Sequence, residues 1–192
     1  MSRRAAIADA AITTLARDGM RGLTHRAVDR AAGLPEGSAS YYFRTRQALL
    51  KATVERLAEL DSTEMVPSIS LPVQSGHELD AFATAAAAII ESWLTNGRER
   101  QVARYELALE ATRRPELRDA LVASGAAIRA MVASQFAAAG IRQPGQRAAD
   151  FVAFVDGLVF DQIAGAGSRN LTSADLVAAI RTLLAAVTGT ES

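Results

Sequence analysis

The sequence contains no cysteine, and its two histidines, His25 and His77, stand far apart along the chain. Without cysteine, disulfides, thiolate metal sites and cysteine nucleophiles are excluded. The chain also lacks a Gly-Lys-Ser/Thr phosphate loop, a paired-histidine metal motif and a Gly-x-Ser-x-Gly elbow. We therefore expect no metal site and no cofactor, and an all-helical enzyme is only a remote alternative.

The sequence is also short of long apolar segments, because no uninterrupted apolar run reaches the roughly 18 to 20 residues of a membrane span. Its start, Met-Ser-Arg-Arg, does not have the hydrophobic region of a signal peptide. We expect a cytoplasmic protein without a membrane partner. Apolar residues still make up 49% of the 192 residues, which is enough to form a real core.

Charge of one sign is in excess only locally. The formal net charge is zero, yet residues 1–60 carry ten Lys and Arg against six Asp and Glu, and residues 61–192 carry eleven against fifteen. The net charges of these two parts are therefore +4 and −4. A positive segment at one end is typical of a nucleic-acid binder whose contact surface is confined to that end, although a random distribution of charge remains an alternative.

Nearly every segment has the pattern of a helix, since alanine and leucine are abundant and apolar residues recur at three- and four-residue spacing. No segment has the alternation of a convincing strand, so we predict an all-α fold. Ile7, Ala11 and Leu15 share one face of a first helix, which should end at Gly19. Residues 65–78, rich in proline, serine and glycine, form the expected linker. The helices expected beyond the linker span about 79–95, 98–113, 115–139, 145–166 and 173–188, and such helices with short links predict a bundle.

Two short helices joined by a tight turn are predicted between these first and later helices. Thr24 can cap a helix that carries Ala27, Val28 and Ala31 inward, and Gly33 should stop it. Pro35 can open the next helix, over residues 36–42, and Thr45 can cap the helix that follows. A helix that reads DNA enters the major groove with polar side chains outward, while its partner helix and a glycine-bearing turn set its angle. Hydroxyl groups, small residues and arginines of this kind are supplied by Ser38, Ser40, Tyr41, Tyr42, Gly37, Ala39, Arg26, Arg44 and Arg46.

These residues resemble the DNA-binding domain of the tetracycline-repressor (TetR) family over about residues 5–60. The features that match in order are the helix ending in glycine, the threonine and arginine that open the next helix, Ala32-Gly33 at the turn, Gly37, the aromatic pair ending at Phe43, and Arg46 before Ala48-Leu49. The resemblance implies about nine helices, with an N-terminal three-helix domain carrying a helix-turn-helix and a C-terminal helical bundle. Residues 1–46 would form the DNA-binding domain. Residues 47–192 would bind a ligand and dimerise, with a helix over 47–64 connecting the two.

Carried over by position, the resemblance makes one group of residues candidates near the bases of double-stranded DNA: Arg26, Glu36, Gly37, Ser38 and Tyr42. It makes His25, Tyr41 and Arg46 candidates for phosphate contacts. Ser40 and Tyr42 stand where the family usually has tyrosine and histidine, so the operator sequence does not carry over. Packing at a helix end is the favoured role of Phe43, and His25 could equally be an exposed first-turn residue.

In the C-terminal part, the last two helices carry more apolar surface than one buried stripe requires, which suggests a partner subunit. The residues expected at this homodimer interface are Phe151, Val155, Leu158, Val159, Ile180 and Leu184; the alternative is that these faces are intrachain core. A pocket for a small apolar effector would be lined by large residues of the middle helices, of which the candidates are Phe82, Trp93, Tyr105, Leu109, Met131 and Phe154.

The favoured hypothesis is a repressor that leaves a near-palindromic operator when its effector binds. A ligand-independent or architectural DNA-binding protein is the alternative, because the same helix-turn-helix would serve it. A filled C-terminal core would favour that alternative.

Overall fold

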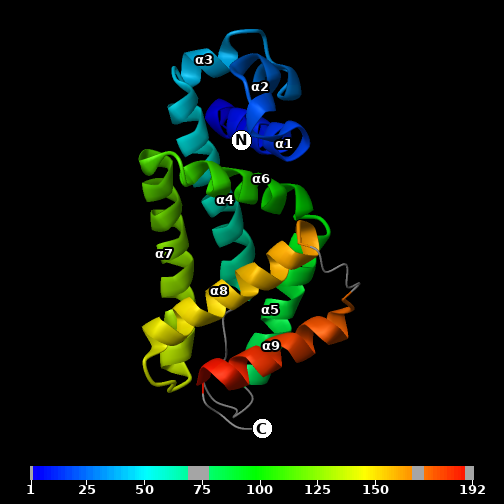
Figure 1. Ribbon diagram of the computed structural model, residues 1–192, viewed down its shortest axis with the longest axis vertical. Helices are drawn as coiled ribbons and strands as arrows, with labels where there is room; N and C mark the ends of the chain where they lie inside the picture. The colour runs from blue at the N-terminus through cyan, green and yellow to red at the C-terminus, as the bar shows by residue number, and fades with distance from the viewer. Residues whose placement is uncertain (1, 69–77, 166–170, 189–192) are drawn as a thin grey trace. The chain divides into compact units, whose positions relative to one another are not determined.

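The computed structural model describes residues 2–68, 78–165 and 171–188, and within these ranges the chain forms nine helices and no strand (Figure 1). This confirms the predicted all-α class. In chain order the helices are α1 (Arg3–Gly22), α2 (His25–Ala31), α3 (Ser38–Tyr42), α4 (Arg46–Ser68), α5 (Glu78–Leu94), α6 (Arg98–Ala111), α7 (Pro115–Ala138), α8 (Pro144–Ile163) and α9 (Ser173–Thr188). Most of the linker predicted over 65–78 lies outside the described residues, and α4 continues past the predicted end near Met65.

The N-caps of α2 and α4 follow the sequence pattern. The hydroxyl of Thr24 accepts the backbone N–H of Ala27 at 3.1 Å, and that of Thr45 accepts the N–H of Ala48 at 3.0 Å. Helix α3 is different, because it begins at Ser38 rather than at residue 36. Gly37 at its N-cap has a φ of 93°, which is unfavourable for a side-chain-bearing residue, so Pro35 and Glu36 belong to the turn and not to the helix.

The chain divides into two compact units, which are described separately. The first comprises residues 1–61 and 97–124, and the second comprises 62–96 and 125–192. Helix α6 and the beginning of α7 thus belong to the same unit as the helix-turn-helix, although residues 47–192 were expected to form the C-terminal domain. The functional division at residue 46 stays a prediction.

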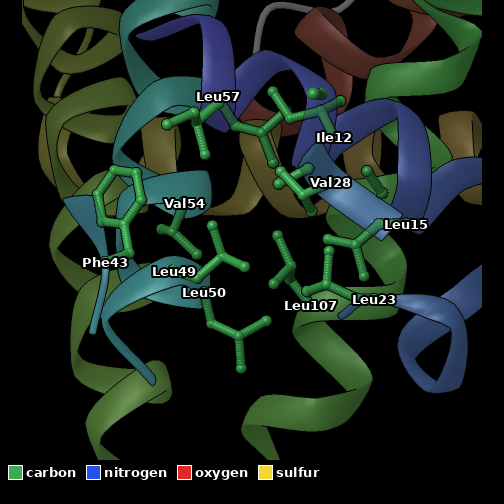
Figure 2. Close-up of a cluster of buried hydrophobic side chains, with 14 of the residues drawn as sticks. Ile12, Leu15, Leu23, Val28, Phe43, Leu49, Leu50, Val54, Leu57 and Leu107 are labelled. Carbon is green, nitrogen blue, oxygen red and sulfur yellow. The ribbon is translucent and has the colours of Figure 1, made fainter. Parts of the chain in front are cut away.

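The core of the first unit gathers apolar side chains from α1, α2, α3, α4 and α6 (Figure 2). Helix α1 packs mainly against α6 and also against α2. Among the side chains there that are exposed by 1% or less, the largest are Ile7, Leu15, Leu23, Val28, Leu49, Leu50 and Leu107. Burying one such side chain contributes about 1.5–3 kcal/mol. The helix-turn-helix therefore stands on a rigid base to which α6 contributes.

The end of α1 is interrupted at Gly19, whose φ of 65° and ψ of −174° are not helical. The carboxylate of Glu106, on α6, accepts the backbone N–H of Met20 at 2.9 Å immediately after this kink. Met20 is thereby held among the last residues of α1, close to the start of the helix-turn-helix. Gly19 thus kinks the helix and does not end it as predicted, because α1 continues to Gly22, and α6 supplies a hydrogen bond that the sequence pattern did not predict.

The core of the second unit is built around three phenylalanines from different helices. The ring of Phe82, on α5, lies 5.6 Å from that of Phe136, on α7, and 5.4 Å from that of Phe151, on α8. Phe136 and Phe151 are also in contact, with ring centroids 5.8 Å apart. Helix α9 packs along α5 and α8 and adds Ile180 and Leu184 to the same core.

Helix α7 has the length and composition of a segment that could cross a membrane, and it is the one described helix that does. Such a single helix is weak evidence for a membrane protein, because core helices meet the same test. In α7, Leu117, Val132 and Phe136 are buried, the other residues are exposed or half-buried, and Asp119 and Arg129 interrupt its apolar sequence.

Candidate functional site

The helix-turn-helix is formed by α2, the turn after it and α3. Helix α2 ends at Ala31, and Gly33 in the turn has a φ of 63°. The backbone N–H of Leu34 then donates to the carbonyl of Asp29 at 2.9 Å, which closes the turn. Leu34 is half-buried against the core of the first unit. The turn predicted at Gly33 is thus present, and it directs the chain into α3.

A buried carboxylate holds the beginning of α3. Asp29 is 2% exposed, and its two oxygens accept the backbone N–H groups of Gly37 at 2.9 Å and Ala39 at 2.7 Å. Ala31, which was predicted to point inward, is exposed, and Asp29 occupies the inward face instead. The reason is that α2 must supply an acceptor for α3, whose own N-cap residue is a glycine without a side-chain oxygen.

The other end of α3 is held by residues from α1 and α2. Nε2 of His25 lies 2.7 Å from the carbonyl oxygen of Phe43, and since a carbonyl only accepts, Nε2 donates. The guanidinium of Arg4 donates to the carbonyl of Tyr42 at 3.2 Å and lies 4.5 Å above the ring of Phe43. Phe43 itself is buried, in agreement with the packing role expected for it.

The outer face of the helix-turn-helix is polar. The side chains of Arg26 and Glu36 are 80% and 69% exposed and form an ion pair of 2.7 Å. Tyr41 is 80% exposed, and Ser40 and Gly37 are exposed beside it. These five candidates therefore share the accessible face at which a groove of DNA could dock. The open space around Gly37 would let a phosphate or base approach its backbone.

The other four candidates of the nine are half-buried, and three of them already use their polar side-chain groups within the protein. Ser38 donates its hydroxyl hydrogen to the carbonyl of Pro35 at 2.7 Å, and Tyr42 packs against the core with its ring 5.2 Å from that of Tyr41. The guanidinium of Arg46 donates to the carbonyls of Met20 and Leu23, and His25 donates to Phe43 as described. Arg46 and His25 therefore have structural roles in addition to the predicted phosphate contacts.

The six effector candidates do not fall in one unit. Tyr105 and Leu109, on α6, belong to the first unit, and Leu109 is 61% exposed. Phe82 lies in the phenylalanine core of the second unit, where its ring is covered. Phe154 is 57% exposed, and Trp93 and Met131 are half-buried. Within the described residues, Nε1 of Trp93 is buried without a hydrogen-bond partner. Trp93 is therefore the effector candidate whose N–H group could donate a hydrogen bond to a ligand.

The six dimer candidates lie mostly inside the single chain. Five are exposed by 9% or less, and these are Phe151, Val155, Val159, Ile180 and Leu184; Leu158 is half-buried. Their apolar surface is used in packing α5, α8 and α9 together, which is the alternative of an intrachain core. Exposed apolar surface on α8 lies instead at Phe154 and Phe160. The sequence of α8 places apolar residues on more than one side of the helix, but only the packing shows which side is buried.

Residues that sequence reasoning missed are Asp29, Arg4 and Glu106, all of which bind backbone groups of the helix-turn-helix or its approach. One signal for Asp29 was available: a helix that begins after glycine requires an acceptor from elsewhere. Among the residues that the structure describes, no three His, Asp or Glu side chains gather as a metal site would require.

Comparison with known proteins gives matches to both parts of the chain. Residues 7–53 match the family profile of bacterial regulatory proteins of the tetR family, and residues 77–190 match that of the tetracyclin repressor-like C-terminal domain. The curated proteins gave no significant match.

Solved structures match over almost the whole chain. A member of the TetR family from Streptomyces coelicolor A3 is 28% identical, with a TM-score of 0.74 over 95% of this chain and 98% of that one. The multidrug binding protein EbrR complexed with ethidium is 26% identical, with a TM-score of 0.72 and the same coverage. A transcriptional regulator from Rhodococcus sp. Rha1 shares the fold at a TM-score of 0.78 and 19% identity, over 97% and 96% of the two chains. Because the two family profiles together cover most of the chain and its helix-turn-helix is complete, the protein belongs to the TetR family of DNA-binding transcriptional regulators.

Proposed function

We propose that this regulator is a repressor that binds a near-palindromic operator as a homodimer and leaves it when a small apolar effector binds. The observation that carries the proposal is the exposed polar face of α2 and α3, where Arg26, Glu36, Ser40 and Tyr41 surround the accessible backbone of Gly37. In helix-turn-helix proteins, the N-terminal residues of the second helix contact base edges. Such a regulator acts on the chromosome, and therefore in the bacterial cytoplasm.

Dimerisation is proposed through the exposed face of α8. Ala153, Phe154, Gly157 and Phe160 are exposed and recur at three- and four-residue spacing, so they share one side of the helix. The side chain of Phe154 is 57% exposed and that of Phe160 is 42% exposed. A second copy of α8 would cover these rings, and Gly157, with open space at its Cβ position, would let the two backbones approach. Two recognition helices in one dimer would read the two halves of the operator.

Effector binding is supported by two structures of EbrR, one with ethidium and one with proflavin, whose chains are 26% and 27% identical to this chain. Their ligands suggest a planar aromatic compound. The buried Nε1 of Trp93 adds a chemical requirement, because an unpaired buried N–H costs about 1–3 kcal/mol. An effector oxygen that accepts from Trp93 would recover this cost, so we propose an aromatic effector carrying a hydrogen-bond acceptor.

The deciding experiment selects binding sites from a pool of random duplexes with the purified full chain and then titrates the selected site at several salt concentrations. We expect one dimer per near-palindromic site and an affinity that falls steeply as salt rises, as phosphate contacts require. If the chain enriches no DNA sequence from the pool, the proposal of a sequence-specific regulator is refuted. A chain that enriches a site but responds to no effector would be the ligand-independent DNA-binding protein.

A further inference from the structure

Helix α3 is too short to hold its own shape. It has five residues, whereas isolated helices shorter than about 12–15 residues are marginal in water. Its N-cap, Gly37, offers no side-chain oxygen, and no side-chain cap is formed there. The orientation of α3 must therefore come from outside it, through the packing of Ala39 and Phe43 in the core and through groups that bind its terminal N–H and C=O groups.

At the N-terminal end of α3 this group is Asp29. Its Oδ2 accepts from Gly37 and its Oδ1 accepts from Ala39, so both oxygens of one carboxylate hold successive parts of the same helix start. The side chain is nearly completely buried, and its backbone carbonyl closes the preceding turn through Leu34. Asp29 thus fixes the helix start and the turn with one residue.

At the C-terminal end of α3, Arg4 of α1 donates to the carbonyl of Tyr42, and the group that α2 supplies is His25, which donates from Nε2 to the carbonyl of Phe43, the C-cap residue. His25 and Asp29 are four residues apart on α2, so they lie on the same face of that helix. One face of α2 therefore carries a donor for the carbonyl end of α3 and an acceptor for its amide end. An anionic group at the N-terminus also complements the helix dipole.

We propose that His25 and Asp29 form a two-ended brace that sets the angle of α3 and thereby its ability to distinguish its operator from other DNA. The proposal rests on the DNA-binding function proposed above. Both are positioning residues that act through the backbone of Gly37, Ala39 and Phe43 rather than by touching bases. Asp29 is acidic and lies within the DNA-binding segment, so the loss of its charge alone would strengthen DNA binding. The brace predicts instead that neutralising Asp29 weakens binding to the operator.

The first variant is Asp29→Asn, which keeps the size of the side chain but has only one oxygen acceptor and turns an NH₂ group toward a backbone N–H. The loss of one negative charge alone should tighten binding to every DNA sequence. The brace instead predicts that affinity for the selected operator falls about tenfold or more, while affinity for a scrambled duplex of the same composition does not fall. Asp119→Asn, at an exposed position on α7, is the control that removes the same charge elsewhere.

The second set of variants tests the other end of the brace and does not depend on whether Asp29→Asn folds well. His25→Gln can place an amide N–H near the position of Nε2 and should retain operator selectivity, whereas His25→Asn is too short to reach Phe43 and should lose it about tenfold. The salt dependence of binding to the scrambled duplex should not change in either variant. A lost cationic phosphate contact would instead lower its slope by about one.

Amide hydrogen exchange of the DNA-free chain distinguishes a local loosening of α3 from a loss of overall stability. In Asp29→Asn, the amides of Gly37 and Ala39 should exchange about tenfold faster, while those of the α4 core remain protected. Wild-type selectivity in both Asp29→Asn and His25→Asn, measured below their melting temperatures, would overturn the brace alone. A wild-type chain that selects no site would overturn the proposed function together with the brace.

Discussion

The guanidinium of Arg46, in the first turn of α4, donates to the backbone carbonyl of Met20 at 2.5 Å, and its other terminal nitrogen donates to the carbonyl of Leu23. Met20 lies near the end of α1, and Leu23 is the C-cap residue of that helix, directly before the helix-turn-helix. On the other side, Glu106 accepts the N–H of the same Met20. The peptide groups of this short segment are therefore held from α4 by a cation and from α6 by an anion.

Replacement of Arg46 should lower stability even without DNA. Arg46→Ala leaves two carbonyls without their charged donor, so we expect the free energy of unfolding to fall by about 1–3 kcal/mol. Arg46→Lys should recover only part of this loss, because one ammonium nitrogen does not reproduce the planar fork. Urea unfolding followed by far-UV circular dichroism measures both. Arg44→Ala, at an exposed position, is the control and should stay within about 0.5 kcal/mol of wild type. Equal stabilities of the two alanine variants would contradict a stabilising role for the hydrogen bonds from Arg46 to Met20 and Leu23, and would leave phosphate binding as the role of Arg46.

The kink at Gly19 gives a prediction that separates backbone strain from crowding. A Cβ atom there would lie 3.6 Å from the carboxylate of Glu106, which is an ordinary contact, but the φ of 65° disfavours alanine. Gly19→Ala should therefore cost about 1 kcal/mol or more of unfolding free energy. Gly145→Ala, in the first turn of α8 with open space at Cβ, should instead stabilise by about 0.5–1 kcal/mol. Thermal denaturation of both variants checks the sign, and a stabilising Gly19→Ala would show that the kink is not required.

The ion pair between Arg26 and Glu36 lies on the face proposed to meet DNA. Its two side chains are largely exposed, so the pair contributes only about 0–1 kcal/mol to stability. Glu36→Gln should leave the melting temperature nearly unchanged, tighten binding to random duplex by releasing Arg26 for phosphate, and alter base preference beside α3. Fluorescence anisotropy with selected and scrambled duplexes measures these effects, and Glu59→Gln on α4 serves as a control for the lost charge. A binding profile identical to wild type would place Glu36 away from the DNA.

Exposed aromatic side chains on α8 predict the oligomeric state. Phe154→Asp should convert a dimer to a monomer without unfolding it, because the ring is 57% exposed in the single chain. Sedimentation velocity over a range of concentrations measures this change, and circular dichroism verifies the fold. Leu109→Asp on α6, at a side chain 61% exposed, is a matched control and should remain dimeric. Dimers in the Phe154 variant would assign the interface to another surface.

Trp93 is the only tryptophan of the chain, so its fluorescence reports on the second unit directly. We expect acridone, whose ring carbonyl can accept a hydrogen bond, to quench this fluorescence at lower concentration than proflavin, which is protonated at neutral pH. Trp93→Phe removes the N–H and should reduce this preference about tenfold, measured through the fluorescence of the ligands. If neither compound binds and neither changes operator affinity, the proposed effector chemistry is wrong.

Local chemistry makes much of this fold readable from the sequence. Thr24 and Thr45 set helix starts through hydrogen bonds to backbone N–H groups three residues on, so composition and spacing predict them. The same local reasoning located a break in helical conformation at Gly19, although α1 resumes after it. The helix-turn-helix is recognisable for the same reason. The start of α3 was misplaced because proline at position 35 is compatible with both a helix start and a turn, and only the positive φ of Gly37 decides between them.

The sequence by itself determined the helices, most of their caps and the family, because these depend on neighbours along the chain. Tertiary structure decided which polar groups are free to act: Asp29 is turned inward to bind α3, and Arg46 is joined to α1. It also decided that α6 packs with α1, and that Phe151 and Ile180 are core while Phe154 remains exposed. Helical periodicity marks apolar faces, but whether a face is buried depends on contacts between residues far apart in the chain.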